Sequence, residues 1–188
     1  VLRQLLDVLV SDENVGRRNA AVEVFWAAGP DSVPILLVGL EQAGKAKKFV
    51  LDALTAVVDE RAESALIGCL SDPDENIRTC AVEALGSLGT ESALAALMSR
   101  IEDAQLLERL ALLESLGKNE SKLPVSQLLE LAKEPILRRA AILLFGFSQD
   151  LAAAEHLVEM LNEGKVVREA AAVAALQLHA AQGKAGRR

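Results

Sequence analysis

Apolar residues recur every three or four positions along most of the chain, which is the spacing of amphipathic helices. Residues 71–98, SDPDENIRTCAVEALGSLGTESALAALM, show this pattern most completely. One apolar stripe in that stretch contains Ile77, Ala81 and Leu85. Strict alternation of apolar and polar residues, which is typical of strands, is convincing nowhere in the sequence. The pattern therefore predicts an all-α fold.

Capping residues divide the 71–98 stretch into two helices. The segment from Ser71 to Asp74 supplies side-chain acceptors and a proline that suit a first helical turn. Gly89 suits the left-handed conformation of a helix C-cap, and Thr90 can cap the next helix. Because about two residues separate the helices, we expect them to lie antiparallel as one helix–turn–helix unit.

The same unit recurs at intervals of about 30 residues. A shift of 60 residues places Gly29 on Gly89 and Arg138 on Arg78. A shift of 90 residues places Arg168 on Arg78 as well. The repeat predicts about six helix pairs. The predicted helices are 2–10 with 14–28, 32–42 with 45–58, 62–70 with 74–88, 91–101 with 104–116, 123–132 with 135–147, and 151–161 with 165–181.

The run D-x-D-x-x-I-R-x-x-A-x-x-A-L-G-x-L-G of residues 72–89, with its weaker copies, resembles the HEAT repeat. It is most similar to the short bacterial HEAT-like repeats associated with phycobilisome lyases. The resemblance covers residues 1–181 and implies one right-handed α-solenoid domain with the second helices on the concave side. Tetratricopeptide repeats carry a Trp/Gly/Tyr signature that is missing, and armadillo repeats have a third helix. We expect residues 182–188, glycine-rich and basic, to form a flexible tail.

The resemblance also implies a ladder in which an aspartate of each intra-pair turn faces an arginine early in the second helix. The matching residues are Asp12, Asp72 and Asp74 with Arg18, Arg78, Arg138 and Arg168. Val50 and Glu108 stand near the arginine position in the second and fourth pairs. We therefore expect the ladder to be broken at those two pairs.

Composition agrees with close-packed helices and argues against some partners. Of 188 residues, 51% are hydrophobic and only 3% aromatic, with no tyrosine, so Leu, Ala, Val and Ile must build the core. The formal net charge is −7, and residues 49–134 carry sixteen acidic and seven basic side chains. That imbalance excludes a track for duplex nucleic acid there, and we interpret the acidic residues as a solubilising surface.

Cysteine usage and the chain start suggest a cellular context. Cys69 and Cys80 do not make a disulfide framework and are interpreted as two small buried thiols in a reducing compartment. The longest apolar run, 140–147, is far shorter than a membrane span. Because the chain begins at Val1 without methionine, we expect it to be a domain of a larger protein. The resemblance to bacterial HEAT-like repeats, with the unpaired cysteines, implies that this protein is bacterial and cytoplasmic.

Residues that could carry chemistry are few. His156 and Glu159 have helical spacing but lack a second His–Glu pair, so a surface histidine is the preferred interpretation. Glycines stand singly near predicted helix ends, which excludes a phosphate-binding loop. We therefore predict no enzymatic activity, catalytic residue, metal or cofactor. Two alternatives stay open, namely a lyase-type enzyme or subunit related to phycobilin lyases, and a regulatory module of a signalling protein.

Binding of a protein or peptide in the concave groove is the predicted function, without nucleic acid or membrane. The register of the second helices places candidate contact residues in this groove, and makes it polar at the third pair and apolar at the fifth. These residues are Asn19, Glu23, Trp26, Thr79, Glu83, Arg139, Leu143, Phe147 and Glu169. Trp26 is either a binding hot spot or a residue that fills the core or a ridge of the helix packing. The run 142–145 is apolar all round its helix, which means burial or an exposed anchor patch.

Overall fold

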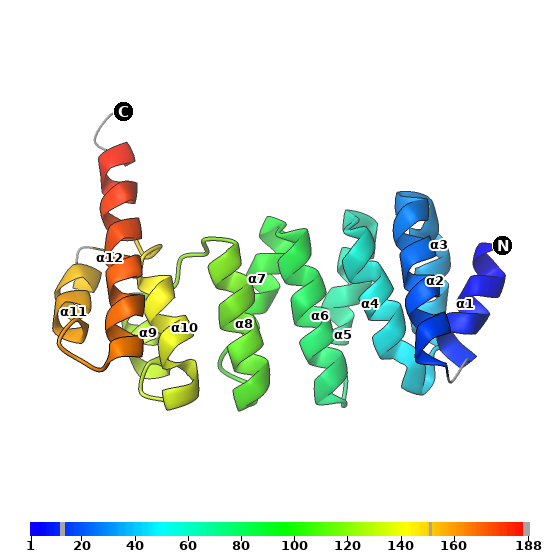
Figure 1. The fold of residues 1–188 in the computed structure, drawn as a ribbon, viewed down its shortest axis with the longest axis horizontal. Coiled ribbons are helices and arrows are strands. Elements are labelled where there is room, and N and C mark those ends of the chain that lie inside the picture. Colours follow the sequence, from blue (N-terminus) through cyan, green and yellow to red (C-terminus); the bar gives the residue numbers. More distant parts are fainter. Residues whose placement is uncertain (12–13, 151, 186–188) are drawn as a thin grey trace. The chain divides into compact units, whose positions relative to one another are not determined.

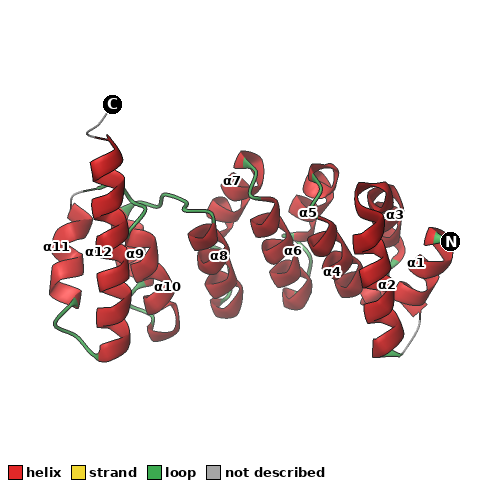
Figure 2. Ribbon diagram, turned by 45° about the horizontal axis from the view of Figure 1, so that its top comes forward, coloured by secondary structure: helices red, strands yellow, loops and turns green. Residues whose placement is uncertain are grey.

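The computed structural model describes residues 1–11, 14–150 and 152–185. Throughout these residues the chain is helical, with no strand, and short loops join the helices (Figures 1 and 2). The predicted all-α fold is therefore confirmed. The contacts divide the chain into two compact units, Val1–Asp103 and Ala104–Arg188, which are described separately below. The single domain expected over residues 1–181 stays a prediction.

Unit 1, residues 1–103, consists of three helix pairs and one further helix. Its helices are α1 (Leu2–Ser11), α2 (Val15–Ala28), α3 (Val33–Gln42), α4 (Lys47–Val57), α5 (Glu63–Cys69), α6 (Glu75–Leu88) and α7 (Glu91–Arg100). Three 3-10 turns, η1 (Gly29–Ser32), η2 (Gly44–Ala46) and η3 (Glu60–Ala62), join some of them. The second helices α2, α4 and α6 pack side by side as one layer, and α1 packs on α3 in the other (Figure 1).

Unit 2, residues 104–188, repeats the arrangement with fewer helices. It contains α8 (Leu106–Lys118), α9 (Val125–Leu131), α10 (Pro135–Phe145), α11 (Ala152–Met160) and α12 (Lys165–Ala185). Helix α10 packs between α8 and α12, α9 lies against α10, and α11 lies against α12. The predicted helix ends agree with the structure to within two residues, except that α12 runs past 181 to Ala185.

The predicted capping residues do form caps. The Asp74 carboxylate accepts a hydrogen bond of 2.9 Å from the backbone amide of Asn76 at the start of α6. Gly89 ends that helix with a φ of 63°, in the left-handed region that favours glycine. The Thr90 hydroxyl then accepts from the amide of Ala93 at 3.2 Å and begins α7. Local sequence therefore fixes this turn.

The core is aliphatic and continuous across each pair. The stripe of Ile77, Ala81 and Leu85 is buried, and burial of such side chains contributes roughly 25 cal/mol per Å² of apolar surface. The two phenylalanines Phe25 and Phe145 are fully buried and are among the largest side chains of the core. Scarcity of aromatics is thus compensated by many small and medium side chains that let the helices approach closely.

The structure corrects the predicted ladder at the second helix pair. A rung does exist there, because Lys47 Nζ of α4 lies 2.6 Å from Asp72 Oδ2 in the turn before α6. The prediction failed because it looked for the cation at Val50, whereas the long Lys47 side chain reaches the acid from one turn earlier. Arg78 instead donates to the backbone carbonyls of Asp72 at 2.9 Å and Pro73 at 3.2 Å.

A second rung has the same spacing in unit 2. Arg138 Nη2 of α10 lies 2.6 Å from Glu163 Oε2 in the turn before α12. In both rungs the acid follows the cation by 25 residues, so the second helix of one pair is tied to the turn of the next pair. No acidic residue stands 25 positions after Arg18, since residue 43 is alanine. The Arg18 guanidinium instead lies 4.0 Å from the centre of the Phe49 ring. Asp12 lies outside the described residues.

The N-terminal part of unit 1 contains an apolar stretch. Among the described residues, the segment Val15–Gln42 is the one that is long and apolar enough, by composition, to cross a membrane. In the structure Gly29, with a φ of 59°, and the turn η1 interrupt it. Its two α-helices have 14 and 10 residues, and a span needs about 20 in one helix. The segment is therefore folded as two packed helices.

Candidate functional site

The second helices of unit 2 enclose a hollow with a volume of about 600 Å³. We call it the α8–α10–α12 hollow. Its lining residues are Leu113, Glu114, Gly117, Lys118, Arg139, Ala140, Leu143, Phe147, Val173 and Gln177. The volume falls within the range of about 300–1,000 Å³ that is typical of ligand pockets.

Small residues explain why three packed helices leave this space. Gly117 has no side chain, and a Cβ there would have no atom nearer than Leu144 Cδ2 at 4.0 Å. Ala140 supplies only a methyl group on the facing helix α10. At Gly146, by contrast, α10 and α12 approach so closely that a Cβ would lie 3.0 Å from the Ala174 carbonyl oxygen. The helices are therefore in tight contact at Gly146 and leave open space at Gly117, and this difference produces the hollow.

The walls of the hollow are mostly apolar. Leu113, Leu143 and Val173 stand 30 residues apart in the sequence, on α8, α10 and α12. Phe147, which follows α10, is the largest apolar side chain of the lining.

Charged side chains border the hollow. Glu114 and Lys118 on α8 and Arg139 on α10 are all exposed. None of the three has a hydrogen-bond or ion-pair partner among the residues that the structure describes. Their charges are thus available to a bound molecule.

Gln177 is a polar group in the apolar wall. Its Oε1 atom is buried and has no hydrogen-bond partner within the described part of the chain. A buried acceptor without a donor costs about 1–3 kcal/mol. The atom lies at the α10–α12 contact, next to Gly146.

Three predicted contact residues meet at this hollow, namely Arg139, Leu143 and Phe147. Ile142, Leu144 and Phe145, their neighbours on α10, are fully buried, so the apolar run is mostly core and Leu143 alone turns toward the hollow. Their role in binding stays a prediction.

Several lining residues were missed by the sequence reasoning. Leu113, Gly117 and Lys118 come from α8, which we did not compare with the fifth pair. A shift of 30 residues places Leu113 on Leu143 and Gly117 on Phe147, and this signal could have found two of them.

The other predicted contact residues do not line the hollow. Glu169 is exposed on α12, one turn before Val173, and lies 3.9 Å from Lys165. Asn19 and Glu23 are exposed on α2, and Thr79 and Glu83 lie on the corresponding face of α6 in unit 1. These five are polar residues on second helices, and their role in binding stays a prediction.

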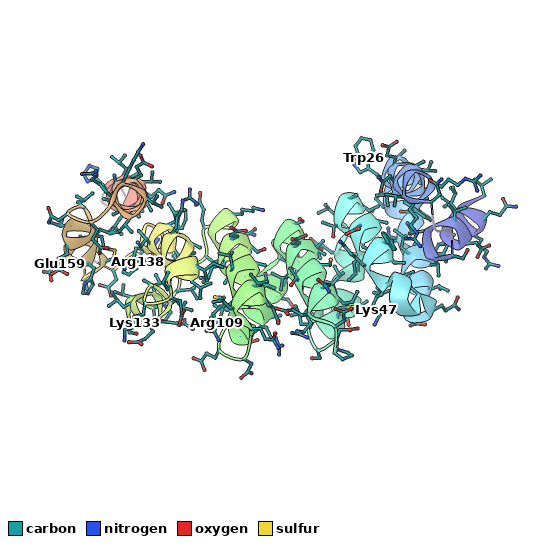
Figure 3. The ribbon with its side chains drawn as sticks, turned by 60° about the horizontal axis from the view of Figure 1, so that its bottom comes forward. Trp26, Lys47, Arg109, Lys133, Arg138 and Glu159 are labelled. Atoms are coloured by element: carbon teal, nitrogen blue, oxygen red, sulfur yellow. The ribbon has the colours of Figure 1, made fainter. Side chains whose placement is uncertain are left out.

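Trp26 is exposed, with 64% of its surface accessible, and Figure 3 shows it pointing away from α2. The alternative of a core residue is therefore wrong. The reason is helical geometry, because the neighbouring Phe25 is fully buried and takes the core-facing position. Trp26 stands about 100° further round the helix.

The interior of unit 1 contains two unreactive thiols. Cys69 and Cys80 are buried and free. Burial raises the pKa of the Cys80 thiol to about 11, and the negative charge of Asp52 adds to this effect. Burial also raises the pKa of Asp52 itself, against the opposing charge of Lys48.

Among the residues that the structure describes, no three His, Cys, Asp or Glu side chains come together in a manner that could hold a metal ion. His156 Nδ1 lies 3.8 Å from Glu159 Oε2 on the exposed face of α11, which forms at most a surface ion pair.

Comparisons with known proteins agree with the helix-pair architecture. Residues 33–117 match the family model described as HEAT repeats. Among solved structures, the chain is similar to the designed armadillo repeat protein YIII(Dq)4CqI, with 14% sequence identity and a TM-score of 0.54. That match covers 95% of this chain and 100% of the designed one. No curated protein sequence matches. The likeness shows the fold, and the predicted α-solenoid class is confirmed.

Proposed function

We propose that the protein is a non-catalytic scaffold that binds a protein or peptide segment, and that the α8–α10–α12 hollow is its contact site. The observation that carries this proposal is the hollow itself, with its apolar walls and unpartnered charges on one layer of helices. Binding energy at protein interfaces concentrates where a few apolar anchors fill well-formed pockets. The hollow offers such a pocket.

The surface next to the hollow supports a partner larger than a small molecule. Val173 of α12 lines the hollow and is exposed, and Leu176, three residues further along the same helix and therefore its surface neighbour, is 71% exposed. A segment anchored in the hollow can therefore bury further apolar surface beside it. Repeat solenoids commonly bind proteins in this way.

Selection from a displayed random peptide library tests the function. We expect enriched peptides to bind the unaltered protein and to lose about tenfold in affinity when Phe147→Ala removes an anchor contact. Val158→Ala is the matched control, because Val158 is an exposed apolar residue on α11 outside the hollow. Failure to recover any binding peptide, or equal losses for the two variants, would contradict the proposal.

Two alternatives rest on the sequence resemblance and stay predictions, as does a cytoplasmic bacterial origin. A lyase related to phycobilin lyases predicts a coloured adduct after incubation with an open-chain tetrapyrrole. A regulatory module predicts a signalling domain encoded in the sequence that flanks residues 1–188.

A further inference from the structure

The apolar character of the hollow is particular to unit 2. In the 30-residue register, Leu143 and Val173 correspond to Glu23, Ala53 and Glu83 on the second helices of unit 1, so two of those three positions are carboxylates. Carboxylates there disfavour an apolar partner because burying them unpaired is costly. The α8–α10–α12 hollow is thus where an apolar side chain can bind.

Two cations without partners stand beside that apolar wall. Lys118 of α8 and Arg139 of α10 are exposed and unpaired among the described residues. Two other cations of unit 2 do have acidic partners, since Arg138 pairs with Glu163 and Lys133 pairs with Glu130. Figure 3 shows Arg138 and Lys133 on this part of the chain. Glu114 supplies a single carboxylate to the border, so the charges there sum to +1.

The two units also differ in their content of charged residues. Unit 1 contains 17 acidic and 9 basic residues, whereas unit 2 contains 10 acidic and 11 basic residues. An acidic segment is therefore repelled by unit 1 and tolerated by unit 2. A basic segment is attracted by unit 1 instead. At the hollow its positive charges would be repelled by Lys118 and Arg139.

We propose that the occupant of the hollow is an acidic peptide segment with one large apolar side chain, which enters between Leu143, Phe147 and Val173 while neighbouring carboxylates pair with Lys118 and Arg139. This inference rests on the proposed binding function. It adds the chemistry of the partner.

Three synthetic peptides test the partner's chemistry. All contain the same central Trp and Leu, which are flanked by Glu in the first, Gln in the second and Lys in the third. Fluorescence anisotropy at low ionic strength is expected to show the Glu peptide binding about fivefold to tenfold more tightly than the Gln peptide, with the Lys peptide weakest. Added salt reduces this difference, because border charges are screened.

Charge reversal at the border provides the decisive variant. In Lys118→Glu/Arg139→Glu the order of the three peptides should invert, and circular dichroism should be unchanged because both side chains are exposed and unpaired. Lys133→Glu is the control for net charge, since Lys133 is exposed on the same unit but does not line the hollow. It should retain the original order.

The outcomes separate this inference from the proposed function. Equal affinity of all three peptides, lost in Phe147→Ala, would overturn the acidic preference and leave the binding function standing. Absence of binding by any of the three peptides, while the random library yields binders sensitive to Phe147→Ala, would likewise overturn only the inference. Failure of both the peptides and the library would overturn the inference and the function together.

Discussion

The carboxylate of Asp72 shows how one residue can join two helix pairs. Partial burial pushes its pKa upward, but hydrogen bonds from Lys47 and the Asp74 amide, with the charges of Lys47 and Arg78, outweigh burial and lower the pKa below 3.8. The hydrogen bond to Asp72 raises the pKa of Lys47 above 10.5, against desolvation. Both shifts favour the charged pair in the folded state.

Asp72→Asn should therefore lower stability by about 1 kcal/mol at neutral pH, as expected for a half-buried ion pair. The stabilisation is complete above pH 3.8 and is lost as the pH falls through the lower folded pKa of Asp72. It is also lost as the pH rises above 10.5 through the raised pKa of Lys47. Urea unfolding of a Lys47/Asp72 double-mutant cycle measures the coupling.

The Lys133–Glu130 pair is the matched control for that cycle, because both of its side chains are about 70% exposed. We expect its coupling to be close to zero. Equal coupling in the two pairs, or a Lys47–Asp72 coupling that persists at pH 2, would show that the rung does not stabilise the stack.

Cys80 should react slowly with thiol reagents in the folded protein. With a pKa of about 11, only about one thiol in ten thousand is ionised at pH 7, and the thiolate is the reactive form. Labelling by Ellman's reagent should be slow for both cysteines in buffer and fast in urea. Rapid labelling of one cysteine in buffer, assigned with the Cys69→Ser and Cys80→Ser variants, would contradict the burial of that side chain.

Arg78 and Arg109 bind turn carbonyls from equivalent places, but Arg78 is the more buried of the two. Arg78 is buried and donates to the carbonyls of Asp72 and Pro73, whereas Arg109, which donates to the Ala104 carbonyl at 2.9 Å, is half-buried. We predict that Arg78→Ala destabilises by about 1 kcal/mol more than Arg109→Ala, since it leaves carbonyls without a donor deeper in the interior. Thermal unfolding measures the difference, and equal melting shifts would refute this assignment.

At the scale of helices, the close approach of α10 and α12 depends on Gly146. A Cβ there would lie 2.4 Å from Gln177 Oε1 and 3.0 Å from the Ala174 carbonyl oxygen. The side chain can rotate away, but the backbone carbonyl can move only if the helices separate. Gly146→Ala should therefore destabilise by about 1–3 kcal/mol, despite alanine's higher helix propensity.

Gly68→Ala is the control for Gly146→Ala, because nothing lies within 4 Å of a Cβ at that helical position. We expect it to stabilise by about 0.5–1 kcal/mol through helix propensity alone. Chemical unfolding of both variants measures the effects. Stabilisation by both substitutions would show that α10 and α12 are not in the close contact that limits the hollow.

Helices could be predicted from the sequence because the signals that define them are local. Asp74, Gly89 and Thr90 act within one turn of the helix ends that they cap. The hollow could not be predicted, since it depends on distances between helices that tertiary packing sets at Gly117 and Gly146. The rung of Lys47 was missed for a related reason, because a long side chain can reach a partner from outside the repeat register.

At the scale of the whole chain, each unit has its own core and its own charge. Repeat proteins are stabilised by contacts within a repeat and with its neighbours, so that damage in one part need not spread through the chain. The residues of α6 and α10 offer a matched test of this expectation. Leu85 and Leu144 are both fully buried leucines on second helices, one in each unit.

Leu144→Ala should increase hydrogen exchange in α8–α12 more than in α1–α7, and Leu85→Ala should do the reverse. Each substitution leaves a cavity that costs about 2–5 kcal/mol, and local opening follows the stability of the unit that loses the contact. Exchange measured by mass spectrometry on the full chain distinguishes the two patterns. If either variant loses protection from hydrogen exchange equally in both units, the two units do not unfold independently. The helices then unfold as one cooperative body despite the division at Asp103.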